Sequence, residues 1–422
     1  MEEIDIPKHW QEKKLGEVCQ TTSGGTPSRV NKNYYEGTIP WVKSGELDRG
    51  LILDTEEKIS EEAVKNSSAK VFPKGTLLIA LYGATIGKLA FLGVDAATNQ
   101  AVCGIYKNEN INSNYLYYFL FSKKPSLVKQ GIGGAQPNIS QGILKNLDIP
   151  IPSLSEQLAI VSKIEELLSD LENGKLQLLT AQQQLKVYRQ SLLKAAFEGK
   201  LTSTKLSEQK EGELPKGWKW VKIDSLLFDR KKGMSTGPFG TMLKKSEHQA
   251  NGIPVLGIEN IGEGTFQMPN KIFITSEKAV ELRNFRVQEN DIIISRSGTV
   301  GEICLLPKKM ENSIISTNLI RVRLNQDIIN PKFFVYLFQG GKVRQQVFEL
   351  CKGSSRAFLN QTILNSLDFP YCSLNEQQLV IDELESKLTV CDKIEETIAQ
   401  SLLQAETLKQ SILKMAFEGK LV

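Results

Sequence analysis

Polar side chains able to read nucleic-acid bases occur in several glycine-rich loops of this chain. Arg296-Ser297-Gly298-Thr299 combines a guanidinium with two hydroxyls. Arginine can donate two parallel hydrogen bonds to guanine, and asparagine or glutamine can pair in the same way with adenine. Lysine contacts phosphates mainly through its charge. The candidates of this kind are Arg29, Lys43, Ser44, Lys88, Asn99, Gln100, Gln136, Asn138, Lys244, Lys245, Arg296, Ser297, Thr299, Asn318 and Arg356.

These loops recur at matching landmarks in the two halves of the chain, with different side chains in each copy. We expect Lys43, Lys88, Gln100 and Asn138 to serve one binding surface, and Arg296, Arg356, Lys244 and Lys245 to serve another. Residues 228–245 hold five basic side chains and one acidic side chain, interleaved with glycines. Taken alone, that stretch fits a solvated charged loop equally well, and any single candidate is more often structural. The recurrence favours a variable recognition surface.

Catalytic motifs are weak. Gly83-Ala-Thr-Ile-Gly87-Lys88-Leu89 lacks the spacing and the final Ser/Thr of a phosphate-binding loop. Asn330-Pro331-Lys332-Phe333 lacks the second proline of an adenine methyltransferase motif, and we expect it to start a helix. Asp229-Arg230-Lys231 has no second carboxylate in a nuclease register. We therefore predict a non-catalytic chain.

Composition narrows the class further. The 422 residues suggest two globular units, and a net charge of +4 permits an acidic partner without establishing one. Six scattered cysteines without a CxxC pair, together with two histidines, predict reduced and partly buried thiols and no metal site. The first residues lack the apolar region of a signal peptide, and no run of about 18 apolar residues occurs. We expect a cytoplasmic location.

One sequence of twelve residues occurs twice in the chain. QSLLKAAFEGKL at 190–201 returns as QSILKMAFEGKL at 410–421, with ten identical positions at an offset of 220 residues. The duplication predicts one architectural unit repeated. We divide the chain into a first globular domain at 1–152, a first long helix at 153–202, a linker at 203–213, a second globular domain at 214–372 and a second long helix at 373–422.

Capping signals frame two long helices. Ser153-x-x-Glu156 and Ser373-x-x-Glu376 fit the capping box at a helix start, and Gly199 and Gly419 fit the left-handed C-terminal turn. About 46 residues lie between these signals, or roughly 69 Å of continuous helix. A kink is plausible at Asn173-Gly174. The residues predicted to form a coiled-coil seam are Leu171, Leu178, Leu185, Leu192, Leu388, Ile398, Leu402 and Ile412.

Heptad spacing favours two helices packed on each other; the alternative is that each apolar stripe packs on its own globular domain. An intervening domain must reverse the chain, so we expect an antiparallel pair with a globular domain near each end. Short β-rich runs at 76–81, 291–295 and 319–324 predict strands, and the apolar stretches at 114–121 and 331–338 predict buried helices. The fold class is α+β: two β-rich mixed domains, two long helices and a pseudo-twofold internal repeat.

These features together resemble the specificity subunit of Type I restriction-modification systems. The resemblance covers nearly the whole chain. It depends most on Ser153-Leu-Ser-Glu-Gln with Ser373-Leu-Asn-Glu-Gln, and on Ala196-Phe-Glu-Gly-Lys-Leu with Ala416-Phe-Glu-Gly-Lys-Leu. Two further segments resemble recurrent sequence motifs of its target-recognition domains: Gly24-Gly-Thr-Pro-Ser and Ile39-Pro-Trp-Val-Lys-Ser-Gly-Glu-Leu.

The resemblance implies that each domain reads one half of a bipartite double-stranded DNA target while the helices set the gap between the halves. It implies two methyltransferase subunits, which would hold S-adenosylmethionine, and motor-nuclease restriction subunits; this chain would hold no cofactor. We expect the partners to dock on Phe197, Glu198, Lys200, Phe417, Glu418 and Lys420. One alternative is a coiled-coil scaffold that binds no DNA. A fragment of a fused methyltransferase-nuclease ranks third.

Overall fold

The computed structural model describes residues 6–131, 138–201, 214–351 and 358–422. Contacts divide the chain into two compact units. The first unit contains residues 1–179 and 399–422, and the second contains residues 180–398. Each unit therefore combines one β-rich domain with part of both long helices, and each is described below by itself.

The first unit is built from short strands and a few helices. Its strands are β1 Gln11–Lys14, β2 Thr21–Ser23, β3 Ile39–Val42, β4 Leu51–Ile52, β5 Glu57–Ile59, β6 Val71–Phe72, β7 Leu77–Ala80, β8 Leu89–Leu92, β9 Ala96–Thr98, β10 Val102–Ile105 and β11 Asp148–Ile151. Its helices are α1 Leu15–Val18, α2 Glu61–Lys65, α3 Ser113–Gln130 and α4 Gln141–Lys145, followed by the start of α5 Leu154–Phe197.

The second unit repeats this plan. Its strands are β12 Lys219–Val221, β13 Met234–Thr236, β14 Ile253–Leu256, β15 Ile272–Ile274, β16 Ile292–Ser295, β17 Ile303–Leu305, β18 Ile314–Ile315, β19 Leu319–Val322 and β20 Phe369–Tyr371. Its helices are α6 Ser276–Glu281, α7 Pro331–Gln339, α8 Gly341–Cys351 and α9 Gln361–Ser366, followed by the start of α10 Leu374–Phe417.

The sheets of the two units have matching strand orders. β2-β10-β7-β8-β4 in the first unit corresponds to β13-β19-β16-β17 in the second, and β5-β3-β9-β6 corresponds to β15-β14-β18. β3 pairs in parallel with β9, as β14 does with β18. The predicted strands at 76–81, 291–295 and 319–324 are confirmed as β7, β16 and β19. The predicted fold class is likewise confirmed.

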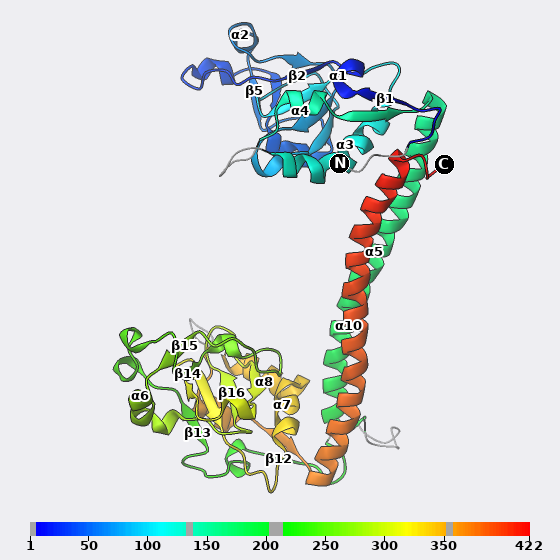
Figure 1. Cartoon of the computed structure of the whole chain (residues 1–422). Helices are drawn as coiled ribbons and strands as arrows, with labels where there is room; N and C mark the ends of the chain where they lie inside the picture. The colour runs from blue at the N-terminus through cyan, green and yellow to red at the C-terminus, as the bar shows by residue number, and fades with distance from the viewer. Residues whose placement is uncertain (1–5, 132–137, 202–213, 352–357) are drawn as a thin grey trace. The chain divides into compact units, whose positions relative to one another are not determined.

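The two long helices run antiparallel, as predicted (Figure 1). In the first unit, Lys175 of α5 lies 2.6 Å from Glu406 of α10, and Glu172 faces Lys409. In the second unit, Arg189 contacts Asp392. The partner's number falls along α10 as the number along α5 rises, which defines the antiparallel direction.

The seam residues of the coiled coil face inward. Leu185, Leu192, Ile398 and Ile412 are buried, and Leu185 and Leu192 share a core cluster with Cys391. Leu171, Leu178, Leu388 and Leu402 are half-buried. α5 is continuous through Asn173-Gly174, so the helix is not interrupted there.

The start of each long helix is tied to its own domain by the same contacts. Ser153 Oγ accepts the amide of Glu156, and Ser373 Oγ accepts the amide of Glu376, as the capping signals predict. The glutamate carboxylates also accept the indole N–H of Trp10 and of Trp218, respectively. The repeated Trp and Glu are thus partners in both copies.

The glutamine that follows each of these glutamates is fully buried. Gln157 Oε1 accepts the amide of Asn112, and its Nε2 donates to the carbonyls of Asn110 and Pro152. Gln377 makes the equivalent three hydrogen bonds in the second unit. Because buried amides need such partners, the glutamine fixes the helix start against the loop that precedes α3 or α7.

The end of each long helix closes against the start of the other domain. Gly199 and Gly419 adopt positive φ angles of 72° and 67°, as predicted for the C-terminal turn. A Cβ at Gly199 would lie 2.2 Å from Pro215 Cγ, and one at Gly419 would lie 2.2 Å from Pro7 Cγ. Only glycine therefore fits both the turn and the close approach.

Phe197 and Phe417 lie inside the cores of the units. Phe417 packs edge-to-face on Tyr115 and Phe119, with ring centroids 5.2 and 5.5 Å apart, and Phe197 packs on Phe333 at 5.3 Å. They are 9% exposed at Phe197 and 4% at Phe417. The cores of the units therefore enclose most of both rings, and the expectation that they contact a partner stays a prediction.

The remaining structural expectations concern helix α7 and the cysteines. Asn330 caps α7, with Oδ1 accepting the amide of Lys332, so Asn330-Pro331 does start a helix as predicted. Asp229 Oδ1 accepts the amides of Lys231 and Lys232, which gives this carboxylate a role in a turn. All six cysteines are buried free thiols. None of the helices within the described residues combines the length and apolar character that crossing a bilayer requires.

Candidate nucleic-acid interface

The polar loops predicted for the first unit do meet in the structure. Gly25 N donates to Thr98 O, Leu81 N donates to Ala101 O, and Tyr82 forms a β-bridge with Asn138. The Thr26 hydroxyl also hydrogen-bonds to Gln100. Strand ends of the two sheets thus gather the loops of 24–29, 82–88, 99–101 and 138 into one surface.

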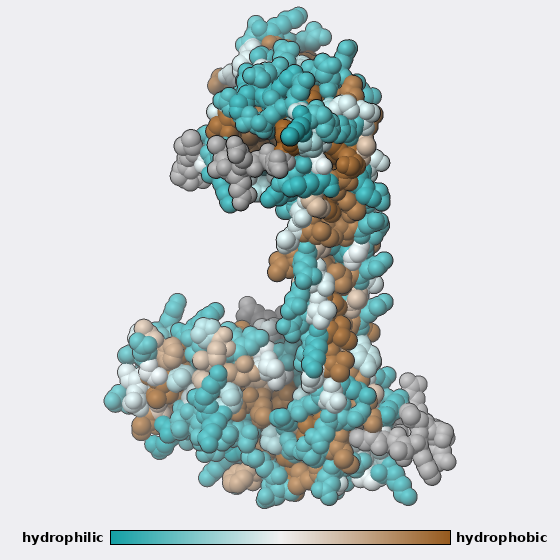
Figure 2. Space-filling model, turned by 45° about the vertical axis from the view of Figure 1, so that its right-hand side comes forward, coloured by the Kyte–Doolittle hydropathy of each residue, from teal (hydrophilic) through white to brown (hydrophobic). Residues whose placement is uncertain are grey.

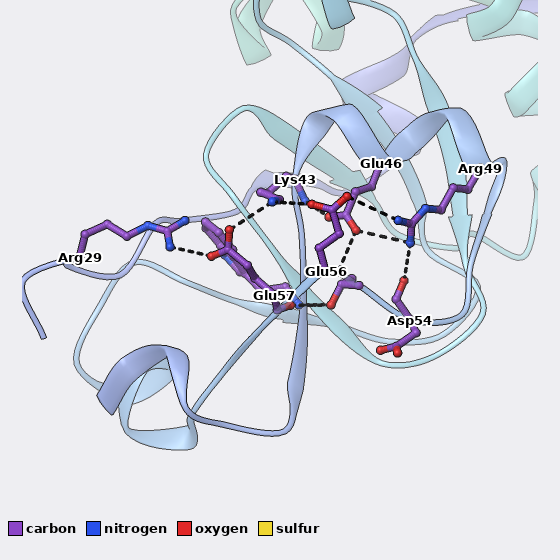
Figure 3. A network of polar contacts seen from close by, with 9 residues as sticks. Arg29, Lys43, Glu46, Arg49, Asp54, Glu56 and Glu57 are labelled. Carbon is purple, nitrogen blue, oxygen red and sulfur yellow. Dashed lines mark hydrogen bonds and ion pairs between the residues drawn. The ribbon is translucent and has the colours of Figure 1, made fainter. Parts of the chain in front are cut away.

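Cations on this surface are already paired with carboxylates (Figure 3). Arg29 Nη1 lies 2.6 Å from Glu57 Oε2, and Lys43 Nζ lies 2.8 Å from Glu56 and 3.1 Å from Glu57. Lys88 forms an ion pair with Asp48. The sequence did not indicate these acids, because each lies up to 40 residues along the chain from the cation that it pairs with.

The acids hold a local framework around Lys43. Glu46 is buried in the 3-10 helix Ser44–Arg49, where its carboxylate accepts the amides of Lys43 and Glu56. The side-chain hydrogen bond from Arg29 is the main cause that lowers the pKa of Glu57 below its usual value. Because the carboxylates are charged at neutral pH, they reduce the positive potential that Arg29 and Lys43 could present to phosphates.

The amides of the first unit are partly satisfied inside the protein. Asn99 is half-buried, its backbone amide donates to Val42 O, and its Oδ1 is shielded from solvent without a hydrogen-bond partner. Gln100 and Asn138 are exposed, and Ser44 is half-exposed at the start of its 3-10 helix. Gln136 lies outside the described residues.

In the second unit, the predicted residues after β16 and before β19 come together. Arg296 N donates to Asn318 O, and Ser297 Oγ donates to Asn318 Oδ1 at 2.9 Å. Thr299 Oγ1 donates to Ser295 Oγ at 3.2 Å. Asn318 and Thr299 are exposed, whereas Arg296 is 7% exposed.

Arg296 is enclosed by two aromatic rings that sequence reasoning missed. Its guanidinium carbon lies 4.2 Å from the ring centroid of Phe358 and 5.2 Å from that of Phe239. The rings come from loops more than fifty residues away on either side, so no local pattern marks them. Arg356, two residues before Phe358, lies outside the described residues.

The lysines of the second unit are more available than those of the first. Lys244 and Lys245 are exposed, and Glu247, the nearest acid along the chain, forms its ion pair with Lys278 at 2.8 Å. Glu247 touches Lys244 only at its backbone amide. Within the described residues, the structure gives neither lysine side chain an ion pair, which suits contact with phosphates.

The long helices carry exposed apolar side chains (Figure 2). Leu179, Leu403 and Leu408 lie on them in the first unit, and Val187, Tyr188, Val390 and Ile394 in the second; each is at least 44% exposed. The polar members of the predicted docking set lie at the helix ends, where Glu198 pairs with Lys200 and Glu418 with Lys420. Exposed apolar side chains mark a protein-binding surface where they form one contiguous patch, so these residues are candidates for contact with a partner.

No group of three His, Cys, Asp or Glu side chains within the described ranges could hold a metal ion. The loop from Gly83 to Lys88 forms a 3-10 turn and leads into strand β8 instead of a helix. It therefore lacks the helix N-terminus that cradles phosphates in nucleotide sites.

Comparison with known proteins agrees with this arrangement. The family model of the Type I restriction modification DNA specificity domain matches residues 7–181 and 215–404. The MjaVIII specificity subunit of Methanocaldococcus jannaschii is 22% identical, with 100% of this chain and 95% of the relative covered. The EcoKI specificity subunit of Escherichia coli K12 is 24% identical, with 99% of this chain and 90% of the relative covered.

Solved structures share the fold. A chain from a structure described as the basis of complex assembly and conformational transition of the type I R-M system has a TM-score of 0.74, with 20% identity and 98% and 99% coverage. The HsdS subunit from Thermoanaerobacter tengcongensis has a TM-score of 0.62, with 20% identity and 98% coverage of both chains. Since both matched segments together span most of its length, this chain belongs to the Type I restriction modification DNA specificity domain family.

Proposed function

We propose that this chain is the DNA-recognition subunit of a Type I restriction-modification enzyme. The observation that carries the proposal is a duplicated frame with divergent loops. The helix starts and ends repeat contact for contact, whereas the loops that the sheets gather differ between units. A frame that repeats while its loops vary suits the reading of two different DNA half-sites.

Each unit reads one half-site in this proposal. The second unit offers exposed Lys244 and Lys245 for phosphates, and Arg296, Ser297, Thr299 and Asn318 near base edges. The first unit offers Gln100 and Asn138 for bases, while its cations are held by acids. Phosphate contacts fix position and base contacts carry the specificity.

The helices set the distance between half-sites and hold the partners. Exposed apolar residues such as Leu403 and Tyr188 would bind methyltransferase subunits, with the charged pairs at Glu198-Lys200 and Glu418-Lys420 at the rim. The repeat favours two such subunits, one for each equivalent frame. This chain is itself non-catalytic in the proposal: the methyltransferases hold S-adenosylmethionine and flip the target adenines, and motor-nuclease subunits add restriction.

Sequencing of methylated adenines in the host, with and without this gene, tests the proposal. The expected result is a split motif that disappears on deletion and returns when the gene is restored. An unchanged set of methylated adenines would contradict the proposal. Binding of the assembled complex to duplex DNA should also weaken steeply with salt, whereas a scaffold without DNA contacts would show no such dependence.

A further inference from the structure

Arg296 is a buried cation without a carboxylate partner in the described part of the chain. Its residue is 7% exposed, and the structure gives the guanidinium one hydrogen bond, from Nη1 to Thr317 O at 3.2 Å. Nε is shielded from solvent and has no acceptor. Taking a charge from water without pairing it is costly, so this arrangement calls for a reason.

Other buried or half-buried arginines of this unit are held by more contacts, although Nε of Arg286 and Nε of Arg321 also lack an acceptor. Arg323 makes two hydrogen bonds of 2.7 Å to the Asp291 carboxylate. Arg321 donates to the backbone carbonyls of Asn284, Arg286 and Lys232. These two arginines stabilise the fold by their own contacts. Arg296 differs, because most of its donor capacity is unused.

The rings around Arg296 are themselves exposed. Phe239 is 57% exposed and Phe358 is 37% exposed, although phenylalanine usually avoids water. A guanidinium stacked on an aromatic face keeps its plane fixed and its edge donors free. The two exposed rings therefore hold one guanidinium in a fixed orientation. This surface suits a flat ligand with polar atoms along its edge.

We propose that Phe239 and Phe358 hold Arg296 as the reader of one guanine in the second half-site. The inference rests on the proposed function and names the base that this part of the site recognises. With Nη1 engaged by Thr317 O, the edge formed by Nε and Nη2 remains for O6 and N7 of guanine. The base reaches that edge when one ring slides aside and packs against the DNA.

Guanine fits this site better than a phosphate. Exposed cations such as Lys244 and Lys245 suit contact with phosphates, because such contacts depend mainly on charge. Arginine can also pair with a phosphate through two hydrogen bonds, but a shielded guanidinium whose plane is fixed by two rings suits the planar O6 and N7 edge of guanine. Ser297 and Asn318, joined by their own hydrogen bond beside Arg296, provide further polar groups for the neighbouring base pair.

The test uses the full complex with its methyltransferase subunits and duplexes that carry the motif found by methylation sequencing. Each base pair of both half-sites is changed singly, and binding is measured for the wild-type chain and for Arg296→Lys, Phe239→Leu and Phe358→Leu. Arg283→Lys, an exposed arginine of the same unit, serves as the matched control. Lysine keeps the charge of arginine but loses its planar fork.

We expect Arg296→Lys to lose about tenfold to a hundredfold discrimination for guanine at one position of one half-site. The phenylalanine variants should relax the same position severalfold. Penalties in the other half-site and the behaviour of Arg283→Lys should stay unchanged. Equal weakening on every duplex with a shallower salt dependence would identify a phosphate contact and overturn the proposal, and so would unchanged discrimination.

If Arg296→Lys fails to assemble, the phenylalanine variants decide, because they retain the arginine. Unaltered guanine preference in both would overturn the proposal. A wild-type complex without any split motif would instead be a failure of the proposed function. The two failures are therefore distinguishable in the same experiment.

Discussion

Individual charges differ between the two recognition surfaces in how they are balanced. Arg29 and Lys43 form ion pairs with Glu56 and Glu57, whereas the described residues give the side chains of Lys244 and Lys245 no ion pair. The candidate cations of the first unit are thus held by carboxylates, and the two candidate lysines of the second unit are exposed. This difference suggests that the first unit relies less on phosphate contacts for its affinity.

Substitution Glu57→Gln should therefore strengthen DNA binding. It frees Arg29, leaves Lys43 paired with Glu56 alone and removes a negative charge. We therefore expect a severalfold higher affinity and a salt slope steeper by about one if Arg29 reaches a phosphate. Filter binding or anisotropy against salt concentration measures both. Glu62→Gln, an exposed glutamate of the same unit, is the control and should have no effect.

The sign of the pH dependence follows from the ion pair. The pKa of Glu57 is lowered, chiefly by the hydrogen bond from Arg29, so the carboxylate stays charged down to a pH below its ordinary value of about 4.3. The gain from Glu57→Gln should accordingly be the same at pH 6 and pH 8. A gain that disappears at pH 6 would mean that the carboxylate is not held as described.

At the scale of the elements, the repeated sequence at the end of each long helix packs that helix end against a globular domain. Gly199 and Gly419 turn the chain, and each lies against a proline that opens the opposite domain. Phe197 and Phe417 then enter the core of that domain. The sequence is thus repeated because both helix ends make the same contacts with a globular domain.

Gly199→Ala and Gly419→Ala should each destabilise the protein by about 1–3 kcal/mol, because a Cβ is strained at positive φ and meets the proline ring. Gly174→Ala is the matched control, since nothing lies within 4 Å of a Cβ there. It sits in the middle of α5 and should stabilise by about 0.5–1 kcal/mol. Urea unfolding measures the free energy of unfolding of all three variants. Equal effects at 174 and 199 would contradict the packing described for the helix ends.

At the scale of the whole molecule, each compact unit is assembled from distant parts of the chain. Residues 399–422 belong with 1–179, and the second unit takes the end of α5 with the start of α10. Two helices of 44 residues each therefore join both recognition domains. This continuity is what would let helix length set the distance between half-sites.

Deletion of one heptad from each helix, 172–178 and 399–405, keeps the seam in register and removes roughly 10 Å of helix. We expect the recognised gap to change by about three base pairs, at 3.4 Å per pair, or binding to be lost. The half-site sequences should stay the same. Methylation sequencing distinguishes the outcomes, and an altered half-site with the old gap would contradict the role of the helices.

Much of the frame could be predicted from the sequence because its signals are local or periodic. Ser153 and Ser373 start the helices, Gly199 and Gly419 end them, and the heptads define the seam. The repeat of these signals also established that the chain contains one unit twice. Family membership followed from the same residues.

Only the tertiary structure decided which polar residues are free to bind. Arg29 and Lys43 are candidate DNA contacts in the sequence, and folding brings Glu57 beside them. Phe417 is a candidate docking residue, and folding packs its ring against Tyr115. The sequence by itself determined the repeated frame, since capping and heptad packing depend on neighbours a few residues apart. Pairing of charges and stacking on Arg296 depend on side chains brought together from distant loops, so folding alone determines them.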